Sequence, residues 1–183
     1  RGFNFETGDL RYSVDVGDPL EDSAPALASD GTIYIGANGP ARHIDITGES
    51  VLHTASNEDG GDVSPCLNGG DQPGMSDGDV GFILFDTDLS RDFTVSASSS
   101  KDVPGMDNNG NFYCCMGDEG TLYKISPSGS VLWTANTARS GGMNSTVAVD
   151  DVADRVYLFQ NYKGGADHVL QAFTLDGNDV FTN

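Results

Sequence analysis

The sequence repeats with a period of about forty residues, and this repeat limits the possible folds more than any other feature. Three units open on a proline, at Pro25, Pro65 and Pro104, and a fourth opens at Asn144 without one. A period near forty is typical of a four-stranded propeller blade, a unit that buries its apolar faces only by stacking on neighbours. The repeat therefore predicts an all-β fold, a β-propeller.

Two further features recur in phase within each unit. A turn dipeptide precedes an aromatic strand, as Asp30-Gly31 does before Tyr34 and Asn109-Gly110 before Tyr113. Such dipeptides favour a two-residue hairpin turn in which both central residues have positive φ. A second hairpin closes each unit on a bulky ring, most clearly over 122–133. The same closing frame recurs over 3–12, 44–53, 82–93 and 173–181.

Five closing hairpins and four opening strands correspond to about four to five four-stranded blades. We place all of residues 1–183 in a single propeller domain or segment. Its predicted units cover approximately 1–15, 23–55, 63–96, 102–135 and 144–183. One unit departs from the pattern, because the stretch between Pro65 and Phe82 lacks the aromatic strand. We expect that blade to contain an irregular loop or a poorly formed second strand.

The order of motifs resembles a known family. The first full unit reads Ser-Ala-Pro-Ala over 23–26, Asp-Gly-Thr-Ile-Tyr-Ile-Gly over 30–36, and Ile-Asp-Ile-Thr-Gly over 44–48. This order is similar to the PQQ-like, or quinoprotein alcohol dehydrogenase-like, propeller repeat over nearly the whole chain. The resemblance implies a ring of about six to eight blades, so we expect these residues to be part of a larger ring. Either further residues of the same polypeptide or other copies of the chain would complete it.

Charge excludes some partners. The 28 acidic and 9 basic residues give a net charge of -19, which would repel a nucleic-acid backbone or an anionic membrane surface. No run of eighteen apolar residues predicts a transmembrane segment. We therefore expect neither nucleic acid nor a membrane span.

Acidic turns raise the question of a metal site. Asp107, Asn109 and Asn111 place side-chain oxygens at alternate positions, which resembles the first half of a calcium-binding loop. The late glutamate of an EF-hand is absent, and the same residues suit a hairpin turn. A weaker cluster of acids follows at Asp150, Asp151 and Asp154. The hairpin turn is the favoured explanation of these residues, and calcium is the one cofactor that the pattern allows as the alternative.

Cysteines and one asparagine suggest covalent chemistry. Cys114 and Cys115 are adjacent, and the family resemblance implies a vicinal disulfide of the kind found beside the quinone in the alcohol dehydrogenases. The simpler explanation is an ordinary strand with two small buried thiols. Asn144 begins an Asn-Ser-Thr triplet, an acceptor pattern for N-glycosylation, which we expect in an exposed loop.

No hydrolase elbow, phosphate-binding loop or zinc-binding motif occurs in the sequence. The set of calcium and quinone ligands of the dehydrogenases cannot be matched either. We therefore predict no catalytic or quinone-binding residues. The predicted function is a non-catalytic extracellular module, secreted, periplasmic or on the cell surface, that binds a protein or glycan or assembles with itself. The alternatives are a fragment of a quinone- and calcium-dependent alcohol dehydrogenase and a structural subunit of a surface filament or layer.

Overall fold

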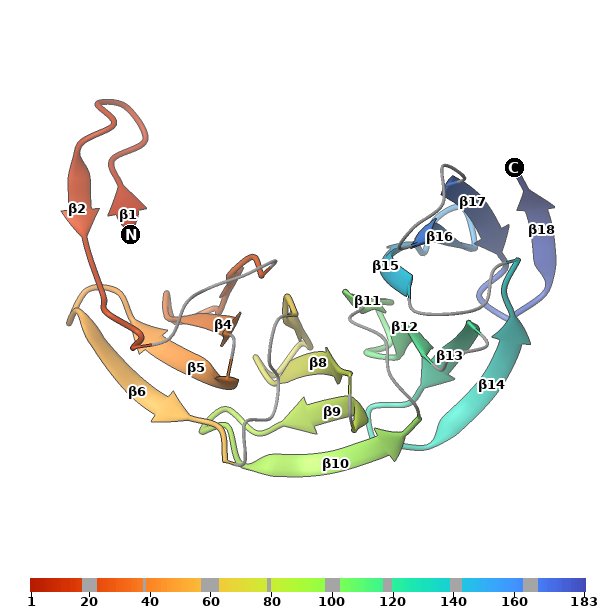
Figure 1. The fold of residues 1–183 in the computed structure, drawn as a ribbon, viewed down its shortest axis with the longest axis horizontal. Coiled ribbons are helices and arrows are strands. Elements are labelled where there is room, and N and C mark those ends of the chain that lie inside the picture. The colour runs from red at the N-terminus through yellow and green to blue at the C-terminus, as the bar shows by residue number, and fades with distance from the viewer. Residues whose placement is uncertain are drawn as a thin grey trace.

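The structure, a computed structural model, describes residues 1–17, 23–37, 39–56, 63–78, 80–97, 103–116, 120–138, 143–162 and 168–183. The regular elements in these ranges are β-strands, which form four four-stranded sheets and one two-stranded hairpin. The sheets stand side by side along an open arc, with the N-terminal hairpin at one end and the C-terminal sheet at the other (Figure 1). This arrangement confirms the predicted propeller fold, with four complete blades and one half-blade.

Every blade is an antiparallel sheet whose strands follow one another in chain order. The N-terminal half-blade comprises β1 (Gly2–Phe3) and β2 (Leu10–Tyr12). Blade 1 comprises β3 (Ala26–Leu27), β4 (Ile33–Ala37), β5 (Gly39–Asp45) and β6 (Ser50–Thr54). Blade 2 comprises β7 (Cys66–Leu67), β8 (Pro73–Asp77), β9 (Gly81–Phe85) and β10 (Arg91–Ser96). Blade 3 comprises β11 (Gly105–Met106), β12 (Phe112–Met116), β13 (Thr121–Ile125) and β14 (Val131–Asn136). Blade 4 comprises β15 (Met143–Asp150), β16 (Arg155–Tyr162), β17 (His168–Phe173) and β18 (Asp179–Thr182).

The opening turn of each blade is longer than the sequence predicted. In blade 1 the Ala28 N–H donates to the Thr32 carbonyl at 2.9 Å, and only Gly31 has positive φ, at 87°. Blade 3 repeats this with Asp107, Asn111 and a single left-handed glycine. The two-residue turn was therefore the wrong prediction. A type I turn followed by one left-handed residue fits the strand twist and needs glycine only at the end.

Alternating side chains on each strand build three separate cores, one in each seam between neighbouring blades. Tyr34 and Met75 belong to the core between blades 1 and 2, and Phe82 and Phe112 to the core between blades 2 and 3. The core between blades 3 and 4 contains the buried residues Tyr113, Cys115, Leu122, Val147, Val156, Leu158 and Phe173. Each blade is thus stabilised by its neighbours, as in other repeat proteins.

The irregular second strand predicted for blade 2 is wrong. Residues 73–77 form the regular strand β8, and all five are buried. Gly74 occupies the position at which blades 1 and 3 have a tyrosine, since each of these residues pairs with the same position in the first strand of its blade. A Cβ atom on Gly74 would lie 2.7 Å from the Phe112 ring and 2.8 Å from the Phe82 ring. Neighbouring rings therefore fill the space of the missing aromatic residue, and the strand stays regular.

Candidate functional site

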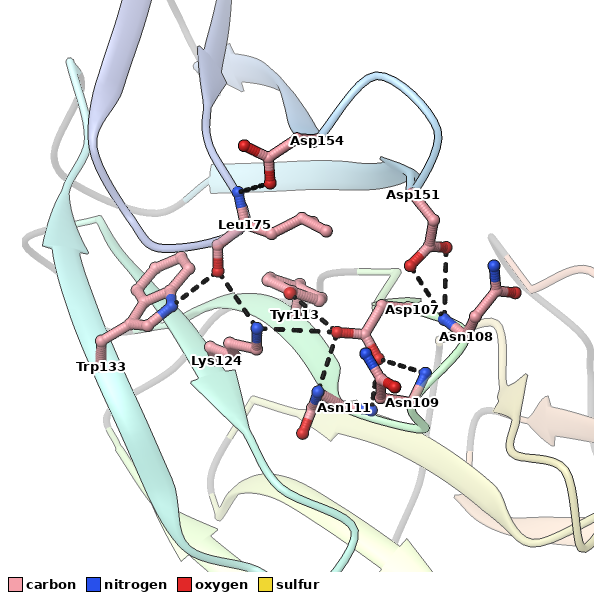
Figure 2. Close-up of polar contacts among 10 residues, drawn as sticks. All are labelled: Asp107, Asn108, Asn109, Asn111, Tyr113, Lys124, Trp133, Asp151, Asp154 and Leu175. Atoms are coloured by element: carbon pink, nitrogen blue, oxygen red, sulfur yellow. Dashed lines mark hydrogen bonds and ion pairs between the residues drawn. The ribbon is translucent and has the colours of Figure 1, made fainter.

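Asp107, the first predicted calcium ligand, lies buried in the opening turn of blade 3 (Figure 2). Its Oδ1 accepts hydrogen bonds from the N–H groups of Asn109 at 3.0 Å and Asn111 at 2.9 Å. Its Oδ2 accepts from the Asn111 side-chain amide at 2.8 Å and from the Tyr113 hydroxyl at 3.0 Å. The structure thus brings the three predicted residues together, and both carboxylate oxygens already serve the turn.

Lys124 completes this network from strand β13. Its Nζ lies 3.6 Å from Asp107 Oδ2, 3.1 Å from the Leu175 carbonyl oxygen, and 5.2 Å from the centre of the Tyr113 ring. Burial by itself raises the pKa of Asp107, but hydrogen bonds from Asn111, Tyr113 and Asn109 lower that pKa below its ordinary value. Burial and the Asp107 carboxylate raise the pKa of Tyr113. Asp107 therefore stays ionised as an anchor between its turn and the seam toward blade 4.

The carboxylates of the weaker acidic cluster in blade 4 also accept hydrogen bonds from backbone N–H groups. Asp150 Oδ1 accepts from two N–H groups of its own turn, at 3.0 and 2.9 Å. Asp151 accepts from the Asn108 N–H, and Asp154 from the Leu175 N–H at 3.3 Å (Figure 2). Among the described residues, no three His, Cys, Asp or Glu side chains are grouped to hold a metal ion. Calcium at either turn stays a prediction.

The adjacent cysteines lie in the middle of strand β12 and are thiols in the structure. Cys114 belongs to the core between blades 2 and 3, whereas Cys115 belongs to the core between blades 3 and 4. Successive side chains of a strand point to opposite faces, so a vicinal disulfide would require both sulfur atoms to leave their cores. The disulfide itself remains a prediction for the isolated protein.

Asn144 lies in strand β15, where it pairs with Asn161, so the expected loop at this position is wrong. Its side chain lies outside the part of the chain that is described.

The histidines, isolated in sequence, are partly brought together. The His43 ring stacks on Tyr34 at 4.1 Å and on His53 at 5.5 Å between centres. Strand register, which the sequence motifs did not reveal, makes His43 and His53 direct neighbours.

Aspartates also link the opening turns of neighbouring blades. The Asp71 carboxylate of blade 2 accepts the Ser29 N–H of blade 1, at 3.1 Å to each oxygen, and the Ser29 hydroxyl. The Asp151 carboxylate of blade 4 accepts the Asn108 N–H of blade 3, at 3.1 and 3.2 Å. We call these two contacts the carboxylate clasps. The sequence offered a signal for them in its aspartate-rich turns, but not their partners.

The outer face of blade 4 is apolar and uncovered. Phe159 pairs with Leu170 across strands β16 and β17, as Cys115 pairs with Leu122 in blade 3. In blade 3 this pair is buried against blade 4, with exposed fractions of 1% and 0%, whereas Phe159 and Leu170 are 47% and 39% exposed. Phe181, in strand β18, lies on the same face and is 41% exposed. These residues form the terminal blade face, a blade-to-blade contact surface that has no neighbouring blade among the described residues.

The other end of the arc has a complementary hollow. A cavity of about 430 Å³ lies between the N-terminal half-blade and blade 1. Its wall includes the aliphatic side chains of Val14, Val16, Ile33, Ile35, Ile44 and Ile46. In the full blades a pair of inner strands lies beside the two outer strands, and β1–β2 has no such pair in the described residues. The N-terminal hollow therefore has the lining of another blade seam.

Comparison with known proteins supports the fold alone. Neither a family model nor a curated protein matches the chain. Among solved structures, BamB from Moraxella catarrhalis is similar with a TM-score of 0.65 and 16% identity, over 93% of this chain and 52% of that one. Virginiamycin B lyase from Staphylococcus aureus is similar with a TM-score of 0.64 and 12% identity, over 85% of this chain and 53% of that one. A protein of unknown function from Bacteroides caccae gives a TM-score of 0.61 and 14% identity, over 94% and 63% of the two chains.

BamB and the lyase are β-propellers, so the fold implied by the sequence resemblance is confirmed. This chain spans between 52% and 63% of the length of the three similar proteins. The described residues contain no helix that is long and apolar enough to cross a bilayer.

Proposed function

We propose that this chain is a non-catalytic β-propeller module, located outside the cytoplasm, that works by protein contact and assembles with a second copy of itself. The observation that carries the proposal is the terminal blade face. Phe159 and Leu170 occupy positions that are fully buried between blades 3 and 4, yet 47% and 39% of their surfaces are exposed. Large apolar side chains grouped on one surface favour a protein interface.

The two ends of the arc are complementary in kind. The terminal blade face repeats the side of a seam that meets the following blade, and the N-terminal hollow repeats the side that meets the preceding one. Two copies placed head to tail would bring each face against a hollow, and a two-fold axis would close the pair into a ring. The chain covers 52% and 53% of the two similar propellers, BamB and the lyase.

Light scattering on the purified 183-residue chain tests the proposal. We expect a mass of twice the 19.2 kDa chain at micromolar concentration in 0.15 M salt. Phe159→Asp places a charge on the terminal blade face and should leave a monomer of 19.2 kDa. Val152→Asp is the matched control, because Val152 is 99% exposed in a turn away from that face, and this variant should remain a dimer.

A monomer over the whole concentration range, or a Phe159→Asp variant that assembles as well as the parent, would reject self-assembly. Mass that grows without limit, with filaments in negative stain, would replace it with the filament or layer alternative, since open head-to-tail contacts do not close. Near-ultraviolet absorbance from a bound quinone together with alcohol oxidation would replace it with the dehydrogenase alternative.

A further inference from the structure

The opening turns of blades 1, 2 and 3 share one backbone donor position. Each turn closes with a hydrogen bond from its first N–H to its fifth carbonyl, at 2.9, 3.1 and 3.0 Å. The second residue of the turn is Ser29 in blade 1, Gly69 in blade 2 and Asn108 in blade 3. The Ser29 and Asn108 N–H groups donate to the carboxylate clasps, Asp71 and Asp151. A carboxylate from the following blade is thus the acceptor that this position takes.

The Gly69 N–H has no acceptor among the described residues. The residue of blade 3 that corresponds to Asp71 is Gly110, and both have left-handed backbones, with φ of 61° and 79°. Glycine has no side chain, so the clasp is missing from the seam between blades 2 and 3. A hollow of about 490 Å³ lies there instead. Its wall consists of Asn68, Gly69, Gly70, Met106, Asp107, Asn108, Asn109, Gly110 and Pro127.

The groups in this wall are compatible with an anion despite the acidic composition of the chain. The one ionised side chain among them, Asp107, is 2% exposed, and Lys124 lies 3.6 Å from its carboxylate. The remaining polar groups are neutral amides, and the side chains of Asn108 and Asn109 make no hydrogen bond to a described residue. Amide N–H groups are good donors to a carboxylate, and such charge-assisted bonds are short and strong.

We propose that the hollow between blades 2 and 3 binds a carboxylate side chain of an acidic peptide, which donates the missing clasp and accepts the Gly69 N–H. The site lies between blades 2 and 3, in the middle of the arc. It is therefore separate from the two ends through which the chain is proposed to assemble. Because Asp71 and Asp151 provide the pattern, the ligand is an aspartate side chain supplied by another polypeptide.

Amide NMR of the whole chain tests this site with N-acetyl-aspartic acid amide as the probe, in 0.15 M NaCl at pH 7. At this salt the Debye length is about 8 Å, which screens the general charge of the protein. We expect a saturable shift of the Gly69 and Gly110 amide signals. The uncharged N-acetyl-asparagine amide has the same shape and should bind roughly tenfold more weakly, since a bond to a charged group contributes more.

Two substitutions at one position separate the donor from the fold. Gly69→Pro removes the N–H at the second position of a type I turn, where proline is favoured, and no protein hydrogen bond is lost. Gly69→Ala keeps the N–H, and its Cβ has no atom within 4 Å. Alanine should bind the probe as the parent does. Proline should weaken binding roughly tenfold or more, read from the Gly110 signal.

Gly110→Asp gives an independent check, because it copies Asp71 into blade 3 and should occupy the hollow from within. Its Cβ would lie 3.3 Å from Pro127, which requires only a small shift of that ring. Loss of probe binding in this variant supports the proposal. Absence of a saturable shift in the parent, equal binding by the proline variant, or a response to calcium chloride instead of the carboxylate would each overturn it.

Discussion

Trp133 packs on a glycine of the next blade, and this contact yields a quantitative prediction for Gly177→Ala. A Cβ on Gly177 would lie 2.9 Å from Cδ2 and 3.0 Å from Cε3 of the Trp133 ring. The ring is held there by its Nε1–H, which donates to the Leu175 carbonyl at 3.0 Å (Figure 2). Gly177 also has a left-handed backbone, with φ of 88°. Alanine is therefore opposed twice, by its own backbone and by the ring.

The two costs can be separated with a second glycine. Gly31 has nearly the same φ, 87°, but a Cβ there has no atom within 4 Å. Gly31→Ala should lower the free energy of unfolding by about 1–2 kcal/mol, the cost of a left-handed non-glycine residue. Gly177→Ala should add the cost of overpacking, about 1–3 kcal/mol, for a total of about 2–5 kcal/mol.

Urea denaturation followed by circular dichroism measures both variants, provided that the slope with urea is unchanged. The same glycine substitution in a Trp133→Leu background completes a double-mutant cycle. There the cost of Gly177→Ala should fall to that of Gly31→Ala. If Gly177→Ala costs no more than Gly31→Ala in the parent, or the cycle shows no coupling, the ring contact does not stabilise the seam and the reasoning fails.

Three further predictions concern ionisable groups. Burial, and then the neighbouring His53, lower the pKa of His43 from its ordinary value of 6.5. The contribution of neutral His43 to the free energy of unfolding is therefore fully present above pH 6.5 and is lost as the pH falls through the lowered pKa. The urea midpoint should decrease between about pH 7.5 and 5, and it should decrease less in His43→Gln. An unchanged midpoint in the parent would contradict this. Asp107→Asn leaves Lys124 without its carboxylate and should cost roughly 2–4 kcal/mol, whereas a cost under about 0.5 kcal/mol would show that the network does not stabilise the turn. Burial raises the pKa of Cys66 to about 11, so the native protein at pH 8 should alkylate slowly there and at the buried Cys114 and Cys115. Denatured without a reductant, the chain should take up three alkyl groups in mass spectrometry if all three cysteines are thiols, as in the structure; uptake of one would show a disulfide, and this is the vicinal one if the alkylated residue is Cys66.

The sequence was sufficient for the blades because period, turn dipeptides and closing rings all repeat in phase. The sequence did not predict the regular strand β8, because glycine by itself is a weak strand residue. The rings of Phe82 and Phe112 occupy the space beside Gly74, and this packing is visible only in the three-dimensional structure. The same limit applies to the left-handed positions. Glu49 and Leu89, with φ of 50° and 63°, occupy the backbone state for which glycine is the usual signal.

The candidate sites were predicted in part. Asp107, Asn109 and Asn111 were correctly expected to lie together, because a short turn confines them. The partners of Asp71 and Asp151 lie more than forty residues away, at Ser29 and Asn108, and only the stacking of blades brings them into contact. An incomplete ring was expected to leave an apolar face uncovered at each end. The residues of the terminal blade face, Phe159, Leu170 and Phe181, could not be named from the sequence, since they alternate like those of any buried strand.

The unequal seams of this arc have a mechanical consequence. Carboxylate clasps join the turns of blades 1 and 2 and of blades 3 and 4, but the part of the chain that the structure describes has no clasp between blades 2 and 3. A force that spreads the two ends of the arc acts on all three seams in series. At the opening turns, the seam between blades 2 and 3 lacks the hydrogen bonds that a clasp provides in the other two. Stretching would therefore be concentrated there, so the chain would bend as two stiff pairs of blades about a compliant joint at its centre.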